Sequence, residues 1–90
     1  MRELIKTSIR SALPDAEIYV FNPDDDGKRF EAIVISEVFK AMSPVEQHRT
    51  VMNAVKSELE TVVHALALKT FTPEVWAVRK SAYDLQERDR

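Results

Sequence analysis

Prolines set the helix boundaries of this chain more firmly than any other residue type. Pro44 follows Ser43 and Pro73 follows Thr72, so a side chain able to cap a helix precedes each of these prolines. An acidic residue comes one or two positions later, near the positive end of the helix dipole. Pro14 prevents the helix predicted before it from continuing. One helix is therefore predicted to end before residue 14, and two others are predicted to begin near residues 43 and 72.

Apolar periodicity predicts the elements of the first half of the chain. Helical spacing over residues 2–13 indicates an amphipathic helix, and the branched and aromatic residues of 16–21 are typical of a strand. The turn formers of residues 22–28 predict the tip of a hairpin, and residues 29–36 return as its second strand. Residues 37–42 have room for a single helical turn.

The second half is predicted to contain a long helix, a strand and a final helix. The long helix begins at Ser43 and continues to about Val63, and residues 65–71 are the third strand. The final helix begins at Thr72, and its apolar face comprises Val75, Trp76, Val78, Ala82 and Leu85. The buried stripe of the long helix comprises Val45, Met52, Val55, Leu59, Val62 and Val63.

The order of these elements is helix, strand, strand, short turn, helix, strand, helix. This order indicates an α+β fold, a small three-stranded sheet with helices packed on one face. A chain of 90 residues holds one core of this kind. Residues 1–90 are therefore predicted to form a single domain, with residues 80–90 as a frayed tail.

Composition excludes several classes of protein. The chain has no cysteine, so it can supply neither a disulfide nor a thiolate ligand or nucleophile. Its net charge of -2 lacks the broad basic field that drives nonspecific binding to nucleic acids. No apolar run approaches the roughly 20 residues that a membrane span needs, and residues 1–13 do not resemble a secretory leader. A cytoplasmic protein without membrane contact is expected.

The two histidines each have a structural and a functional interpretation. His64 falls at the predicted end of the long helix, where it either hydrogen bonds to unpaired carbonyls or ligates a metal that a second molecule also holds. His48 precedes Met52 by four residues and Val55 by seven, so it is expected at or near the core. About 24 Å of ideal helix would separate the two histidines, so they cannot chelate one ion unless the helix breaks.

Other polar candidates favour structural roles. The run Asp24-Asp25-Asp26-Gly27 lacks the ligand spacing of a calcium loop and predicts a solvated hairpin tip. Trp76 is interpreted as part of the core, with a partner surface as the alternative. Ser36, Ser43 and Ser57 have no base and acid arranged near them. The pattern indicates a binding module rather than an enzyme.

Four segments of the chain together resemble the BolA family. Their order and spacing, with the elements His-Ala-Leu and Thr-Pro-Glu, extend the resemblance from Leu4 to Trp76. It implies the α+β order given above and a fold similar to that of a type II KH domain. The segments are Phe30-Glu31-Ala32-Ile33-Val34-Ile35-Ser36, Val38-Phe39-Lys40-Ala41-Met42-Ser43, Val45-Glu46-Gln47-His48-Arg49-Thr50-Val51 and Val63-His64-Ala65-Leu66-Ala67-Leu68-Lys69-Thr70-Phe71-Thr72-Pro73-Glu74.

The resemblance implies partnership with a monothiol glutaredoxin. A two-iron two-sulfur cluster then bridges the two proteins, held by thiolates of the glutaredoxin and glutathione and by a BolA histidine that His64 matches. A chain without cysteine must borrow such thiolates. The expected protein is a non-enzymatic adaptor in iron-sulfur trafficking or iron sensing, a monomer or weak homodimer that holds no cluster alone. Thr72, Pro73 and Trp76 are expected to help dock the glutaredoxin.

The hairpin tip departs from the family pattern. Several members carry a second His or Cys ligand there, whereas this chain has Asp24-Asp25-Asp26-Gly27-Lys28. The second protein ligand is therefore unknown, and the candidates are Asp26, a harder oxygen donor, and His48.

A DNA-binding regulator is the alternative function that the resemblance implies, through a helix-turn-helix-like surface. Arg49 and Lys56 lie seven residues apart on the predicted long helix and would form a basic stripe on one face. Glu46, Glu58 and Glu60 share that helix, and the chain has no Gly-x-x-Gly loop to clamp a single strand.

Overall fold

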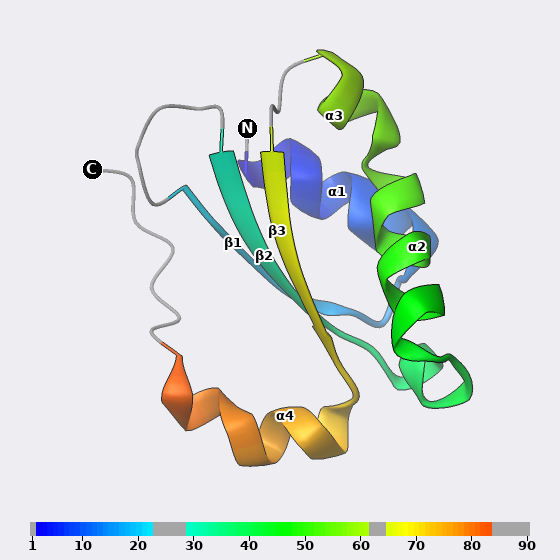
Figure 1. Cartoon of the computed structure of the whole chain (residues 1–90), viewed down its shortest axis with the longest axis vertical. Coiled ribbons are helices and arrows are strands. Elements are labelled where there is room, and N and C mark those ends of the chain that lie inside the picture. Colours follow the sequence, from blue (N-terminus) through cyan, green and yellow to red (C-terminus); the bar gives the residue numbers. More distant parts are fainter. Residues whose placement is uncertain (1, 23–28, 62–64, 84–90) are drawn as a thin grey trace.

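The computed structural model describes residues 2–22, 29–61 and 65–83. Within these ranges no helix has both the length and the apolar character needed to cross a membrane. The elements follow the predicted order, except that the predicted long helix is divided in two (Figure 1). They are α1 (Arg2–Ala12), β1 (Glu17–Phe21), β2 (Arg29–Ile35), the 3-10 helix η1 (Glu37–Ala41), α2 (Pro44–Ala54), α3 (Lys56–Thr61), β3 (Ala65–Phe71), α4 (Pro73–Arg79) and the 3-10 helix η2 (Lys80–Ala82).

The described strands form one three-stranded sheet in the order β1-β2-β3. β1 and β2 pair antiparallel, with Glu17 opposite Ile35, which confirms the predicted hairpin. The hairpin tip at residues 23–28 lies outside the described residues. β3 pairs parallel with β2, with Ala65 opposite Arg29. A parallel pair needs a long crossover, and the segment that contains η1, α2 and α3 supplies it.

The larger hydrophobic core lies between one face of the sheet and the helices α1 and α2. The helical spacing of α1 places Ile5 and Ile9 on this core, where each is at most 1% exposed. The aliphatic side chains of β1 and β2 meet them at alternate positions, as the strand period of two requires. The buried members are Ile5, Ile9, Leu13, Ala16, Ile18, Val20, Phe30, Ala32, Val34, Phe39, Val51 and Val55.

A smaller aromatic cluster covers the opposite face of the sheet. Trp76 of α4 is 4% exposed there and packs with Ile33 and Ile35 of β2. The rings of Tyr19, Phe71 and Tyr83 lie around it, with centroids 5.9, 5.2 and 5.6 Å from that of Trp76. The α+β class and the three-stranded sheet are thus confirmed, but helices lie against both faces rather than one.

The start of α2 follows the sequence prediction. The hydroxyl of Ser43 accepts a hydrogen bond from the backbone N–H of Glu46 at 3.2 Å and donates one to its carboxylate at 3.3 Å. Pro44 occupies the first turn, where a missing N–H costs nothing. The predicted cap therefore forms through the hydroxyl of Ser43, which is bonded reciprocally to Glu46.

The end of this helix differs from the prediction. α2 stops at Ala54, Val55 has the non-helical angles φ -106° and ψ 13°, and α3 begins at Lys56. Residues 45–61 contain neither glycine nor proline, so the sequence carries no breaker signal. The interruption coincides with a tertiary contact, because Glu58 of α3 is buried and accepts a hydrogen bond from Ser8 of α1.

The buried stripe of α2 is rotated relative to the prediction. Val51, which the predicted stripe omits, is completely buried, whereas Val45 is 64% exposed. Gln47 lies on the buried side because its amide nitrogen donates to the carbonyls of Phe39 and Met42, both at 3.1 Å. His48 consequently lies on the exposed flank, and its predicted place at or near the core is wrong.

Candidate functional site

Two of the three candidate ligands from the sequence, His64 and Asp26, lie outside the described residues. The residues that directly follow these two segments are described, so their positions in the sheet can be compared. Lys28 is bonded to Arg29, the first residue of β2, and His64 is bonded to Ala65, the first residue of β3. Arg29 and Ala65 are direct partners in the parallel ladder. The two segments therefore join neighbouring strands at the same end of the sheet.

The chain reaches His64 through α3, and contacts with α1 and the core hold this short helix. Glu58 is 7% exposed and accepts a hydrogen bond from the hydroxyl of Ser8. Leu59 packs against the larger core, and its backbone N–H donates to the carbonyl of Val55 at 3.0 Å. A six-residue helix is marginal by itself, so these contacts are what order it.

The predicted docking residues lie together at the start of α4. The hydroxyl of Thr72 accepts a hydrogen bond from the backbone N–H of Val75 at 3.4 Å, and Pro73 is in the first turn. Thr72 and Pro73 are half-buried, whereas Trp76 lies inside the aromatic cluster, which confirms its core role. A partner at this end of the molecule would instead meet Val75 and Val78.

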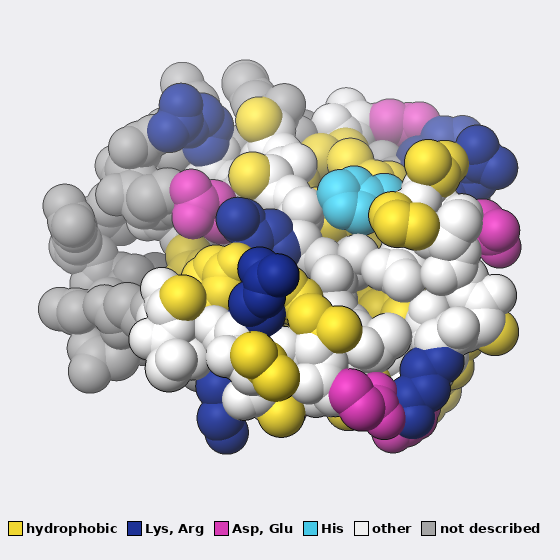
Figure 2. Space-filling view, turned by 60° about the horizontal axis from the view of Figure 1, so that its bottom comes forward, with side chains coloured by type: hydrophobic (Ala, Val, Ile, Leu, Met, Phe, Trp, Pro, Cys, Tyr) yellow, Lys and Arg dark blue, Asp and Glu magenta, His cyan; other side chains and the backbone are white. Residues whose placement is uncertain are grey.

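Those two valines show that the predicted apolar face of the final helix is only partly correct. Val75 is 45% and Val78 is 77% exposed, and Ala82 is also exposed. α4 is short and covers only one end of the sheet, so Trp76 alone of its side chains is buried (Figure 1). Figure 2 shows hydrophobic and basic side chains intermixed at this end of the molecule.

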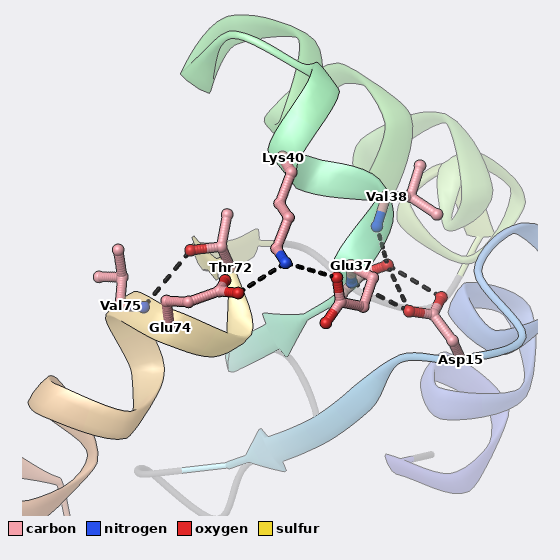
Figure 3. A network of polar contacts seen from close by, with 8 residues as sticks. Asp15, Glu37, Val38, Lys40, Thr72, Glu74 and Val75 are labelled. Atoms are coloured by element: carbon pink, nitrogen blue, oxygen red, sulfur yellow. Dashed lines mark hydrogen bonds and ion pairs between the residues drawn. The ribbon is translucent and has the colours of Figure 1, made fainter.

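A polar network links η1 to the turn after α1, and no local sequence pattern connects these two parts of the chain. Ser36 is 1% exposed, and its hydroxyl donates to the carboxylate of Asp15 at 2.9 and 3.0 Å. The same hydroxyl accepts from the backbone N–H of Val38, and the N–H of Glu37 donates to Asp15 (Figure 3). An acid 21 residues away in the sequence thus folds against Ser36, but no base accompanies it.

Ser36 nevertheless has a structural role rather than a catalytic one. Its hydroxyl caps η1, and its partner is a carboxylate without a histidine between them. A signal for the cap was present, since serine directly before a one-turn helix is a favoured N-cap. Only folding could reveal Asp15, because no local pattern connects residues so far apart in sequence.

Lys40 connects η1 to the start of α4. Its ammonium group lies 2.8 Å from the carboxylate of Glu37 and 2.6 Å from that of Glu74 (Figure 3). Hydrogen bonds to Glu37 and then to Glu74 raise the pKa of Lys40. The hydrogen bond to Lys40 and that to its own backbone amide lower the pKa of Glu74. The bridge therefore holds one edge of the docking region in place.

The candidate basic stripe is not a single helical surface. Arg49 is exposed on α2 and Lys56 is exposed as the first residue of α3, but Val55 interrupts the helix between them. Their spacing of seven residues therefore does not place them on one face of a continuous helix, as the sequence predicts. The interruption at Val55 lies close in sequence to the contact of α3 with α1.

The described residues build no metal site of their own. The chain contains no cysteine, and in the described ranges no three His, Asp or Glu side chains are placed to hold a metal ion. His48 is exposed on α2 and belongs to no such set. An imidazole from His64 is thus the one nitrogen ligand that the segment before β3 can offer.

The family of this protein is established by comparison with known sequences. The family model described as BolA-like protein matches residues 3–75. The chain is 41% identical over 54 residues to BolA-like protein 1 of Mus musculus, covering 60% of this chain and 39% of that protein. It is 31% identical over 74 residues to the acid stress protein IbaG of Escherichia coli K12, covering 81% and 84% respectively. The chain belongs to the BolA-like family.

Other relatives agree with this assignment in sequence and in fold. The DNA-binding transcriptional regulator BolA of Vibrio cholerae is 37% identical over 54 residues, covering 60% of this chain and 51% of that protein. The solution structure of BolA1 from Mus musculus superposes with a TM-score of 0.74 at 30% identity, covering 93% and 73% of the two chains. A BolA homologue from Coxiella burnetii gives 0.72 at 32% identity, covering 86% and 96%.

Proposed function

We propose that this protein is a cytoplasmic, non-enzymatic adaptor that binds a monothiol glutaredoxin and shares a two-iron two-sulfur cluster with it. The observation that carries the proposal is the donor set. A chain of this family without cysteine, and without a described group of metal ligands, can contribute an imidazole but cannot hold a cluster alone. Thiolates from glutaredoxin and glutathione would complete the site, and the shared cluster would be the cargo or the signal in iron-sulfur trafficking or iron sensing.

The residues of this chain would act by positioning one ligand and one surface. α3, held to α1 through Glu58 and Ser8, fixes one side of the segment that contains His64. The pairing of Ala65 with Arg29 fixes the other side. These constraints reduce the entropy that must be lost when a partner engages the segment.

The docking surface in this proposal surrounds the start of α4. Thr72 and Pro73 are accessible there, and exposed Val75 and Val78 add apolar area, while Trp76 supports the surface from the core. Without the partner, the protein would be a monomer or weak homodimer that holds no cluster.

The proposal is tested by assembling the complex from this chain, a monothiol glutaredoxin, glutathione, iron and sulfide. The complex should show visible absorbance and circular dichroism that neither protein gives alone. His64→Ala should change this spectrum and shorten the lifetime of the cluster, because one iron loses its nitrogen ligand. An unchanged spectrum and lifetime in His64→Ala would show that His64 is not a ligand.

Two further variants address the second ligand. His48→Ala removes the exposed imidazole of α2, and Asp26→Asn removes the candidate oxygen donor of the hairpin tip. We expect His48→Ala to leave the spectrum unchanged, since its imidazole lies in no described set of metal ligands. Unfolding midpoints of all three variants separate loss of a ligand from loss of the fold.

DNA binding is the second candidate function, favoured by the name of the Vibrio cholerae relative and by the exposure of Arg49 and Lys56. The discriminating measurement is the salt dependence of binding to duplex DNA, because each phosphate neutralised by a basic side chain steepens the slope. Replacement of Arg49 by Ala should reduce that slope by about 1 if the side chain contacts a phosphate. No binding at low salt would eliminate this function.

A further inference from the structure

A pocket of about 320 Å³ lies between the start of β1, the start of η1 and α4, at the other end of β2 from the pair of Arg29 with Ala65. Its apolar wall comes from Ile35, Pro73, Trp76 and Ala77. This volume is at the lower end of the range for ligand pockets, which suits one long side chain rather than a large cofactor. Pro73 and Trp76 also belong to the proposed docking surface, but the described lining of the pocket includes none of the candidate metal ligands, so the two proposals can be tested separately.

The charged groups around the pocket are predominantly negative. Asp15, Glu17 and Glu37 line it, against the single ammonium group of Lys80. Lys40 pairs with Glu37, but within the described residues neither Asp15 nor Glu17 forms an ion pair. The pocket therefore combines an apolar wall with a rim that favours a positive charge.

The carboxylate of Asp15 is held in a fixed orientation. It accepts one hydrogen bond from the hydroxyl of Ser36, shared between its two oxygens, and one from the backbone N–H of Glu37 (Figure 3). A carboxylate has about four acceptor positions, so at least about one remains for a ligand. Glu17 accepts from the hydroxyl of Tyr19 and likewise retains acceptor positions. Oriented acceptors of this kind bind a hydrogen-bonded cation better than mobile ones do.

The arrangement does not suit a metal ion. Among the described residues, no three acidic side chains converge on one point, as the ligands of a metal ion would. The carboxylates instead lie around the pocket. A planar guanidinium has five N–H donors and can reach two carboxylates at once. Its methylene stem would lie along the wall formed by Ile35, Trp76 and Ala77.

We propose that this pocket receives the side chain of an arginine displayed by a partner protein. The guanidinium lies between the carboxylates of Asp15 and Glu17, and the stem contacts the side chains of Trp76 and Ala77. The apolar wall favours a side chain with a methylene stem, and the excess of carboxylates gives the complementary charge. The positive charge of Lys80 repels that of the arginine, so the natural chain binds the arginine weakly.

Trp76 makes this proposal directly measurable, because it is the only tryptophan of the chain and lines the pocket. The full chain is titrated with the capped tripeptide Gly-Arg-Gly while the fluorescence of Trp76 and the backbone amide shifts of Ser36 and Glu37 are recorded. The same peptide with citrulline in place of arginine keeps the shape and removes the charge. We expect saturable binding of the arginine peptide, weaker binding of a lysine peptide, and none of the citrulline peptide.

Two substitutions act in opposite directions. Glu17→Gln keeps an acceptor for Tyr19 and should lower the association constant about two- to fivefold, the size of one exposed charge pair. Lys80→Glu should raise it by a similar factor, which loss of structure cannot imitate. Glu60→Gln, an exposed site on α3, changes the net charge equally and should leave binding unchanged.

The outcomes are decisive. Equal binding of the arginine and citrulline peptides, or no increase in Lys80→Glu, would overturn the proposal. Tighter binding of free agmatine than of the peptide would overturn the assignment to a protein side chain. A failure of the cluster assembly with His64→Ala would leave this titration unaffected, so the two proposals fail separately.

Discussion

The two faces of the sheet are stabilised in different ways. Among the described residues, the core on the face covered by α1 and α2 has twelve buried members, nearly all aliphatic, whereas that on the face covered by α4 has three, ringed by partly exposed aromatic side chains. Buried apolar area is the main favourable term in folding, so the first face provides most of the stability. The second face is smaller and more open, and it contains both the proposed docking surface and the pocket. In this domain, the less stable face is the one available for binding.

The largest expected effect is in the aliphatic core. Ile9→Ala removes a completely buried side chain between α1 and the sheet and should lower the free energy of unfolding by about 2 to 5 kcal/mol. Urea denaturation followed by far-ultraviolet circular dichroism measures this loss. If Ile9→Ala lowered the free energy of unfolding less than a comparable truncation in the aromatic cluster, the aromatic face would contribute more stability than the aliphatic one.

Trp76→Leu tests the aromatic cluster. We expect it to cost about 2 kcal/mol, less than Ile9→Ala, because leucine fills part of the space and the site is near the surface. Hydrogen exchange should accelerate more in α4 than in α1, since the variant weakens only the contacts of α4 with the sheet. Equal acceleration in both helices would show that the two faces unfold as one unit.

Ser36→Ala tests the junction between the faces. It leaves the backbone N–H of Val38 and the carboxylate of Asp15 without a partner hydroxyl, and we expect a cost of about 1 to 2 kcal/mol. Ser43→Ala is the matched control, because it removes an exposed cap and should cost about 0.5 to 1 kcal/mol. Equal costs for the two variants would indicate that burial of Ser36 adds nothing.

The smallest effect is expected from the exposed bridge of Lys40 and Glu74. Because the pKa of Glu74 is lowered in the folded state, its contribution is present above the usual value of 4.5 and is lost as the pH falls through the lowered pKa. The raised pKa of Lys40 gives a contribution that persists below 10.5 and is lost as the pH rises through the raised value. The stability difference between the natural chain and Glu74→Gln should be constant near neutral pH, disappear in acid and decrease with salt. A difference that persists in acid would contradict the bridge as its cause.

Local signals predicted much of this fold correctly. The reciprocal cap at Ser43 and the cap at Thr72 are as expected, because a cap depends on residues within three positions of each other. The core positions Ile5 and Ile9 of α1 follow from the helical period alone. The role of Trp76 in the core also follows from its size and position.

The candidate site was less predictable than the fold. The position of His64 in the sequence left a structural and a functional role open, and the family resemblance favoured the ligand. His64 lies outside the described residues, so its role as a ligand stays a prediction. His48 was placed near the core from its spacing to Met52, but the stripe passes through Val51 and leaves His48 exposed. The helical period determines the direction of the buried face only to within several tens of degrees of rotation about the helix axis. Packing against the sheet selects which residues are buried.

The sequence by itself determined the order of the elements, the helix starts and the absence of any thiolate ligand, because each depends on residue type or on contacts within one helical turn. The tertiary structure decided the break at Val55, the parallel pairing of β3 with β2 and the location of α4 on the opposite face. It also brought Asp15 to Ser36. These features depend on contacts between residues far apart in the chain, whose energies exist only once the core has formed.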